Sequence, residues 1–278
     1  MNWLKIRYNK KTAKKYGWRP SWFGKNLKEF DSVLIKAVEK FQTEHVLDVD
    51  GKVGPATFRR LLSTRDLELP ENFILVDGVR LPIECDVKID LLPSNCYKTY
   101  GPMRKPTMIV THWDVCTSAS KCKRVLQARG ISTHFCIDND GVIYQYVDTN
   151  NIGWHAGKRA VNSKSIGIDF SNAYYMKYDK WYIKKGFGPR PVCKSSVVHG
   201  VKLKPHLGYY PIQIEAYKKL IKVLSDHYKI KLETPVHAAV MPLAAKGKFQ
   251  GIVSHYHLTR GKIDCAGLNI RGIIDSLD

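Results

Sequence analysis

Short apolar segments alternate with turns and with one long amphipathic segment between residues 105 and 278, and this alternation constrains the fold more than any other feature. Apolar runs short enough for single strands cover residues 108–111, 133–137, 142–147, 165–169 and 249–254. Residues 211–228 instead have apolar side chains at helical spacing, with Tyr217, Leu220 and Leu224 on one face. Strands that alternate with helices predict an α/β domain over residues 105–278.

Residues 1–66 have the pattern of a small all-α domain. The spacing of apolar side chains predicts a helix over residues 33–41, with Asp31 or Ser32 as its N-cap. A second short helix is predicted over residues 56–62, directly after a proline that favours a first helical turn.

Residues 67–104 separate these two parts of the chain. They contain strand-like runs such as residues 73–81 and are interrupted by Pro82, Pro93 and Pro102. Proline is tolerated in edge strands and loops but not in central strands. We therefore expect a linker or an edge hairpin here, and the predicted domains are residues 1–66, 67–104 and 105–278.

The chain carries a strong positive charge. It has 45 Lys and Arg against 25 Asp and Glu, which gives a formal net charge of +20. Such a chain is attracted to polyanions, including nucleic acid, anionic lipid and an anionic cell wall. The sequence has no zinc finger, no RNA-recognition motif and no basic-region heptads, so we expect no nucleic-acid partner.

Composition excludes further classes of protein. Hydrophobic residues make up 44% of the chain, which is enough for a packed core. No run approaches the roughly 20 apolar residues that a membrane-spanning helix needs, so we expect no stable membrane insertion. The first residues lack the apolar core of a signal peptide, so we expect a chain in the cytoplasm that is not exported by a standard signal. We also expect a monomer.

The seven cysteines are odd in number and scattered, which indicates free thiols made in a reducing compartment. Cys116 and Cys122 flank the segment after His112. We expect free thiols at these two positions as well, with a metal cluster or a disulfide as the alternatives.

Three residues far apart in the sequence have the chemistry of zinc ligands. His112 ends one predicted strand, His255 ends another, and Cys265 lies in a loop. Strand ends bring side chains to one edge of a sheet, where ligands converge. Two imidazoles and a thiolate would give Zn²⁺ three protein ligands and leave a fourth position for water, which is typical of a catalytic site. Zinc lowers the pKa of its water to about 7, so a nucleophile exists at neutral pH.

The N-terminal part contains a recognisable set of segments, Val38-Glu-Lys-Phe-Gln42, Asp50-Gly-Lys-Val-Gly-Pro-Ala-Thr57 and Leu61. This set resembles the small three-helix peptidoglycan-binding domain. The resemblance implies a module that anchors the chain to the cell wall, with Phe41 and Gln42 as substrate-binding residues.

The larger part contains an ordered series of motifs: Thr111-His-Trp, Ser132-Thr-His-Phe-Cys-Ile-Asp-Asn-Asp-Gly141, Trp154-His-Ala-Gly157, Asn162-Ser-Lys-Ser-Ile-Gly-Ile-Asp169 and Lys262-Ile-Asp-Cys-Ala-Gly267. The series resembles the zinc-dependent N-acetylmuramoyl-L-alanine amidases of type 2. That resemblance implies a mixed sheet flanked by helices, with zinc at one edge. It also implies hydrolysis of the amide bond between N-acetylmuramic acid and L-alanine in peptidoglycan.

The resemblance also assigns metal ligands. His112 and His255 match the two histidine ligands of the family. The third ligand, Cys or Asp, usually precedes Pro-Gly; here Cys265 precedes Ala-Gly, and we favour it as the third ligand. Asp264 is the alternative, because Lys262-Ile-Asp264 also fits a family variant. His257 is a further alternative, although we expect it to support the ligands rather than bind the metal.

Other residues of these motifs are expected to act on the substrate. Asp169 matches an acidic position of the family and would accept a proton from the zinc-bound water, or else orient a histidine. Lys262 would stabilise the developing oxyanion. Trp154 and His155 are expected to line the substrate groove, with core packing as the alternative for Trp154.

A binding module joined to an amidase, without a signal peptide, is similar to a phage endolysin. Such an enzyme accumulates in the host cytoplasm and degrades the bacterial cell wall after a partner opens the membrane. The alternative is a peptidoglycan-recognition protein on the same fold, which binds peptidoglycan without cleaving it.

Overall fold

A computed structural model describes residues 2–67, 72–100 and 104–277. The chain divides into two compact units, Met1–Leu69 and Pro70–Asp278. Among the described residues, none of the helices combines the length and the apolar character needed to cross a bilayer.

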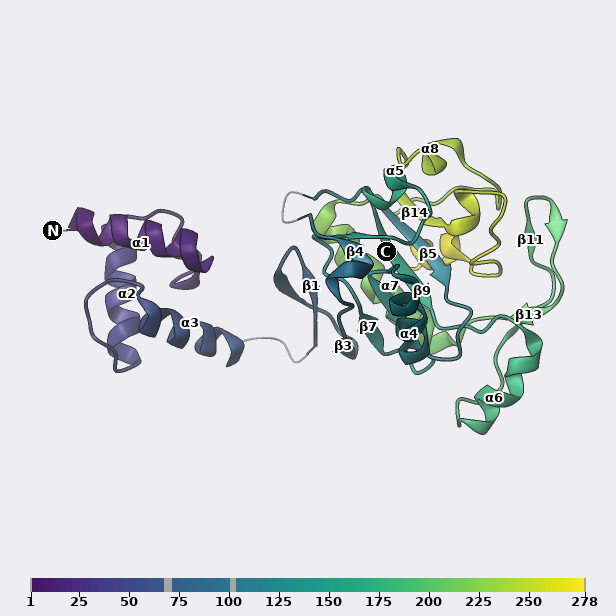
Figure 1. The fold of residues 1–278 in the computed structure, drawn as a ribbon, viewed down its shortest axis with the longest axis horizontal. Helices are drawn as coiled ribbons and strands as arrows, with labels where there is room; N and C mark the ends of the chain where they lie inside the picture. The colour runs from purple at the N-terminus through teal and green to yellow at the C-terminus, as the bar shows by residue number, and fades with distance from the viewer. Residues whose placement is uncertain (1, 68–71, 101–103, 278) are drawn as a thin grey trace. The chain divides into compact units, whose positions relative to one another are not determined.

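The smaller unit is built from three α-helices (Figure 1), α1 (Asn2–Tyr16), α2 (Ser32–Glu44) and α3 (Pro55–Leu67), with the 3-10 turn η1 (Pro20–Trp22) between the first two. This confirms the predicted all-α domain. Asp31 is the N-cap of α2, because its carboxylate accepts hydrogen bonds from the backbone N–H groups of Val33 and Leu34. The sequence pattern did not predict α1, which carries much of the basic N-terminal segment.

The larger unit contains a six-stranded mixed sheet, which confirms the α/β prediction. Its strands in spatial order are β14 (Gly251–Ser254), β5 (Met108–Trp113), β9 (Ser165–Phe170), β6 (Phe135–Ile137), β7 (Ile143–Gln145) and β3 (Val87–Ile89). The first four strands are parallel to one another. β7 is antiparallel to β6 and parallel to β3.

One face of this sheet packs against α7 (Pro211–Tyr228), the helix predicted over the same residues. Alternate apolar residues of the strands, such as Ile109, Ile168 and Phe135, join the core with that helix. Thr111 and Tyr217 link the two elements by a hydroxyl–hydroxyl hydrogen bond of 2.6 Å. Because side chains alternate along a strand, the residues between them point to the other face.

That other face carries His112, Asp169 and Cys136 in one row across β5, β9 and β6. His112 is the register partner of Asp169, and Asp169 is also the partner of Cys136. The helix α4 (Ala119–Arg129) packs beside β6 on this side, where Cys122 joins Cys136 in a small core cluster. The sheet therefore has one apolar face and one face that carries chemically reactive side chains.

Residues 72–100 pack with the larger unit. The strands β1 (Phe73–Val76) and β2 (Val79–Pro82) form an antiparallel hairpin, and β3 is an edge strand of the main sheet. After η2 (Ser94–Cys96), β4 (Tyr97–Lys98) pairs with β8 (Ile152–Gly153). This segment is thus part of the sheet-containing unit and does not form a separate linker.

The remaining elements surround the sheet. The segment that contains α6 (Asp179–Lys184) and the hairpin of β11 (Val197–Val198) and β12 (Val201–Lys202) projects from the sheet (Figure 1). Shorter elements are α5 (Arg159–Asn162), η3 (Met176–Tyr178), β10 (Val192–Cys193), β13 (His206–Leu207), α8 (Pro242–Ala245), η4 (His255–His257) and α9 (Ile270–Asp275).

Candidate functional site

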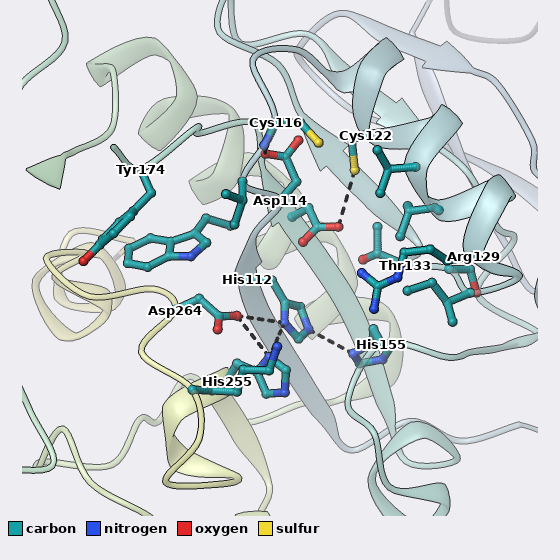
Figure 2. A pocket seen from close by; sticks show the side chains of 18 of the residues that line it. His112, Asp114, Cys116, Cys122, Arg129, Thr133, His155, Tyr174, His255 and Asp264 are labelled. Carbon is teal, nitrogen blue, oxygen red and sulfur yellow. Dashed lines mark hydrogen bonds and ion pairs between the residues drawn. The ribbon is translucent and has the colours of Figure 1, made fainter. Parts of the chain in front are cut away.

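A pocket of about 360 Å³ opens at the carboxyl ends of β5 and β14. Figure 2 shows three of its side chains pointing toward one another, His112 from β5, His255 from η4 and Asp264 from the loop after it. η4 begins directly after β14, which is parallel to β5, so both histidines lie at the same edge of the sheet. All three side chains are buried.

The potential ligand atoms of these residues are close together. The Oδ2 atom of Asp264 lies 3.2 Å from Nδ1 of His112 and 3.0 Å from Nδ1 of His255. The two Nδ1 atoms are 3.1 Å apart. This is a compact group of two imidazole nitrogens and one carboxylate oxygen, the donor types that zinc takes in catalytic sites.

A chain of hydrogen bonds behind His112 fixes its tautomer. Ser165 donates its hydroxyl hydrogen to the carbonyl of Val161 over 2.8 Å, so its oxygen accepts from Nε2 of His155 at 3.3 Å. The Nδ1 atom of His155 then has no hydrogen and accepts from Nε2 of His112 at 3.0 Å. This assignment leaves a lone pair on Nδ1 of His112, directed at Asp264 and His255.

Burial and local charge keep His112 and His155 neutral. Burial, together with the nearby positive charges of His255 and Lys262, lowers the pKa of His112 to about 4. Burial also holds the pKa of His155 well below its usual range. For Asp264, burial alone would raise the pKa, but the imidazoles of His112 and His255 outweigh it and hold the pKa below its usual range. The expected species at neutral pH are neutral imidazoles at His112 and His155 and a carboxylate at Asp264.

A glycine makes room for the supporting histidine. The ring of His155 lies against β9 at Gly167, where an added Cβ would be 2.7 Å from Cγ of His155. Any larger residue at this position would displace the ring that orients His112. Glycine is therefore needed at position 167 of this strand for steric reasons.

Comparisons with known proteins identify the family of the chain. Residues 102–267 match the family model described as N-acetylmuramoyl-L-alanine amidase, which is more than half of the chain and includes all the residues described above. The chain belongs to the N-acetylmuramoyl-L-alanine amidase family. Residues 14–61 of this amidase-family chain match a second model, described as a putative peptidoglycan binding domain. No curated protein matches the chain.

Several solved structures are similar to the amidase-family chain. The amidase LysC from Clostridium intestinale URNW has 17% identity and a TM-score of 0.44, over 71% of this chain and 98% of its own. AmiD from E. coli, solved with a peptidoglycan fragment, has 19% identity and a TM-score of 0.42, over 74% of this chain and 65% of its own. The hydrolase AmiA from Staphylococcus aureus has 12% identity and a TM-score of 0.44, over 75% of this chain and 94% of its own.

The structure brings together two of the three sequence-predicted ligands. His112 and His255 meet, but Cys265 does not join them. Cys265 is fully buried in the core against α7, and burial raises the pKa of its thiol well above the usual range. Asp264, the alternative ligand of the sequence analysis, lies beside the two histidines instead. Neighbouring side chains in a loop point in different directions, so only one of the pair reaches the histidines, and it is the carboxylate.

His257 lies away from this group. Residues His255–His257 form a 3-10 turn and not a strand, so the two histidines do not face the same side. The Nδ1 atom of His257 accepts from the backbone N–H of Ser254 at 3.0 Å, and its Nε2 atom lies 3.1 Å from the carbonyl of His237. Both ring nitrogens are thus used by the backbone.

Asp169 and Lys262, the predicted catalytic residues, both line the pocket. Asp169 is buried, and this burial raises its pKa well above the usual range, with the negative charges of Asp114 and Asp264 adding to the effect. Its Oδ2 atom lies 3.9 Å from Sγ of Cys122. Lys262 is exposed at the rim, where its charge acts on His112.

Trp154 and His155 also line the pocket, but in different ways. Trp154 is 38% exposed, so its indole face is available at the pocket wall. His155 uses both ring nitrogens within the protein, on His112 and Ser165. It therefore orients the ring of His112, a contact that the sequence did not predict.

Phe41 and Gln42, the predicted substrate contacts of the small unit, are engaged within it. Phe41 is half-buried and packs edge-on against Phe23 with ring centroids 5.4 Å apart. Gln42 is buried, and its amide holds the loop before α3. It donates to Asp50 and Thr57 and accepts from the backbone N–H of Gly51. These contacts indicate a structural role for Gln42.

Proposed function

We propose that this chain is a zinc-dependent N-acetylmuramoyl-L-alanine amidase that degrades the bacterial cell wall in the manner of a modular phage endolysin. The observation that carries the proposal is the convergence of His112, His255 and Asp264 on the pocket floor of a chain of this family. Asp264 replaces Cys265 as the proposed third ligand.

The three donor atoms fit a divalent cation by their own hydrogen-bonding needs. His112 has no hydrogen on Nδ1, and a carboxylate accepts only, so His255 supplies at most one hydrogen among three atoms that lie within 3.2 Å of one another. Lone pairs that converge in this way repel unless a cation lies between them. Zinc bound there supplies Lewis acidity and, at neutral pH, a nucleophilic water.

The chain's own residues would prepare the amide for attack. His155 holds the ring of His112 in place at the pocket that would receive the amide. Asp169 accepts a proton during attack and returns it to the leaving amine, a role suited to a carboxyl whose pKa is raised by burial. Lys262 places an ammonium at the rim, near the developing negative charge.

The small unit and the net charge would keep the enzyme on its substrate. Residues 14–61 match a peptidoglycan-binding model, and the formal charge of +20 favours an anionic wall. Trp154 offers an exposed indole on which a sugar face would pack.

Digestion of purified peptidoglycan tests the proposal. We expect wild-type protein to release peptides with a free N-terminal L-alanine, identified by mass spectrometry after N-terminal labelling. Removal of metal with a chelator should abolish release, and Zn²⁺ should restore it.

The matched control is Asp264→Asn, which retains the shape of the side chain and removes the charged ligand. It should bind peptidoglycan but release no peptide. New reducing ends without free alanine would contradict the amidase, and binding without release by the zinc-loaded wild type would favour the recognition protein.

A further inference from the structure

A second group of potential metal ligands lies on the same face of the sheet. The ligand atoms of Asp114, Cys122 and Cys136 all lie within 4.8 Å of one another. The Sγ atom of Cys136 is 3.8 Å from Oδ2 of Asp114. Two sulfurs and one carboxylate oxygen at these separations are donors that a thiophilic divalent cation such as zinc accepts.

The group is distinct from the histidine group. Cys136 lies on β6 and His112 on β5, with β9 between them, and the register places Asp169 of β9 next to both. Cys122 approaches from the first turns of α4, on the pocket side. Figure 2 shows Asp114 and Cys122 at the opposite end of the pocket from Asp264 and His255.

Hydrogen bonds orient the carboxylate of Asp114 toward the sulfur of Cys136. Its Oδ1 atom accepts from the backbone N–H groups of Cys116 at 2.8 Å and Asn172 at 3.0 Å. Its Oδ2 atom accepts from the hydroxyl of Ser171 at 3.2 Å and faces Cys136. Hydrogen bonds that fix one oxygen and direct the other toward sulfur are the supporting contacts that ligating carboxylates have in metal sites.

The three ligands also come from three separate elements. Asp114 follows β5, Cys122 belongs to α4, and Cys136 belongs to β6. All seven cysteines are free thiols, so both sulfurs are available. A cation held here would join the loop after β5, the start of α4 and the sheet.

We propose that Asp114, Cys122 and Cys136 form a second, thiolate-containing site for a divalent cation of the zinc class, separate from the amidase centre. On binding, each thiol would lose its proton to solvent, and two metal–sulfur bonds and one metal–oxygen bond would form without any change of oxidation state. This site goes beyond the proposed function and does not depend on it.

Cobalt(II) distinguishes the two sites, because only the second has sulfur. The reduced, metal-free full chain is titrated with Co²⁺, and bound metal is counted by elemental analysis after dialysis. We expect two equivalents, of which one produces a sulfur-to-cobalt charge-transfer absorption in the near ultraviolet. His255→Ala should lose one equivalent and retain the absorption. Cys136→Ser should lose the absorption and retain the other equivalent.

Further variants make the outcome decisive even if Cys136→Ser folds poorly. Asp114→Asn keeps the volume of the side chain and should weaken cobalt binding at the sulfur site at least about tenfold. Cys85→Ser, outside the group, should leave the absorption unchanged. No charge-transfer absorption at saturating Co²⁺ would overturn the proposal. So would absorption that persists in both Cys122→Ser and Cys136→Ser, or absorption that is lost in Cys265→Ser.

Discussion

At the scale of single residues, the first prediction concerns which of Asp264 and Cys265 is the third zinc ligand. Asp264→Ala removes a ligand, so zinc affinity should fall by more than about 100-fold, beyond the loss typical of a supporting residue. Cys265→Ser should retain zinc and activity, but it should lower the free energy of unfolding by about 1–3 kcal/mol because it places a hydroxyl in an apolar core. Zinc titration against a chelating dye and chemical denaturation measure the two effects.

The opposite pattern would restore the thiolate as the ligand. Retention of zinc by Asp264→Ala, together with its loss in Cys265→Ser, would contradict the geometry of the pocket.

His155 gives a second prediction at this scale. His155→Ala removes the acceptor for Nε2–H of His112, so the ring is free to rotate and zinc affinity should fall about 10–100-fold. His155→Asn places an oxygen near the position of Nδ1 and should recover part of the loss. Equal affinity in the alanine and asparagine variants would exclude a positioning role.

The buried His134 predicts how stability depends on pH. It accepts from the backbone N–H of Gly167 at 3.0 Å, and burial together with the charge of Arg104 lowers its pKa to about 3. Between pH about 6.5 and 3, the unfolded chain binds a proton there and the folded chain does not. The free energy of unfolding should therefore fall with decreasing pH in this window, by about 1.4 kcal/mol per pH unit from this group.

The measurement is denaturation of metal-free protein at several pH values. His134→Gln should take up about one proton fewer on unfolding near pH 5, and the two proteins should have the same slope above pH 7.5. Parallel profiles for wild type and variant across the acidic range would refute the assignment.

At the scale of elements, Gln42 joins α2 to the loop before α3. Its side-chain amide makes several hydrogen bonds. The amide nitrogen donates to Oδ1 of Asp50 at 2.9 Å and, in a buried contact, to Oγ1 of Thr57 at 3.1 Å. Gln42→Ala removes these bonds and leaves the buried backbone N–H of Gly51 without this acceptor, so it should destabilise the small unit by about 2–3 kcal/mol. Hydrogen exchange of peptides from residues 32–62, measured on the full chain, reports this loss.

Thr43→Ala is the control, because Thr43 is exposed on the same helix. Unchanged exchange in Gln42→Ala, combined with weaker binding to peptidoglycan, would instead support the predicted substrate contact.

The elements themselves were predictable to different degrees. The helix at Pro211–Tyr228 was found from its helical periodicity, and the strand at Met108–Trp113 was found as a short apolar run over residues 108–111. The helix α4 was not predicted, because its polar composition gives little apolar pattern and it packs with the sheet through a few residues such as Cys122.

At the scale of the whole molecule, the net charge of +20 predicts salt-dependent binding to the wall. Raising ionic strength from about 0.1 to 1 M shortens the Debye length from about 10 to 3 Å, so the bound fraction in a sedimentation assay should fall. Walls stripped of anionic polymers should show much weaker salt dependence. Binding to intact walls that is independent of salt would contradict an electrostatic contribution.

The sequence by itself determined the α/β fold, the helical small unit and the histidines at the strand ends. The spacing of apolar residues and the ends of apolar runs are local properties of the chain, so they can be read without the fold. Only the tertiary structure placed Asp264, and not Cys265, beside the two histidines, since adjacent loop residues differ in direction and not in spacing. It also revealed the hydrogen bonds of His155 with His112 and of Asp114 with Asn172, which join residues distant in sequence. Contacts of this kind depend on how strands pack side by side, and no local pattern encodes them.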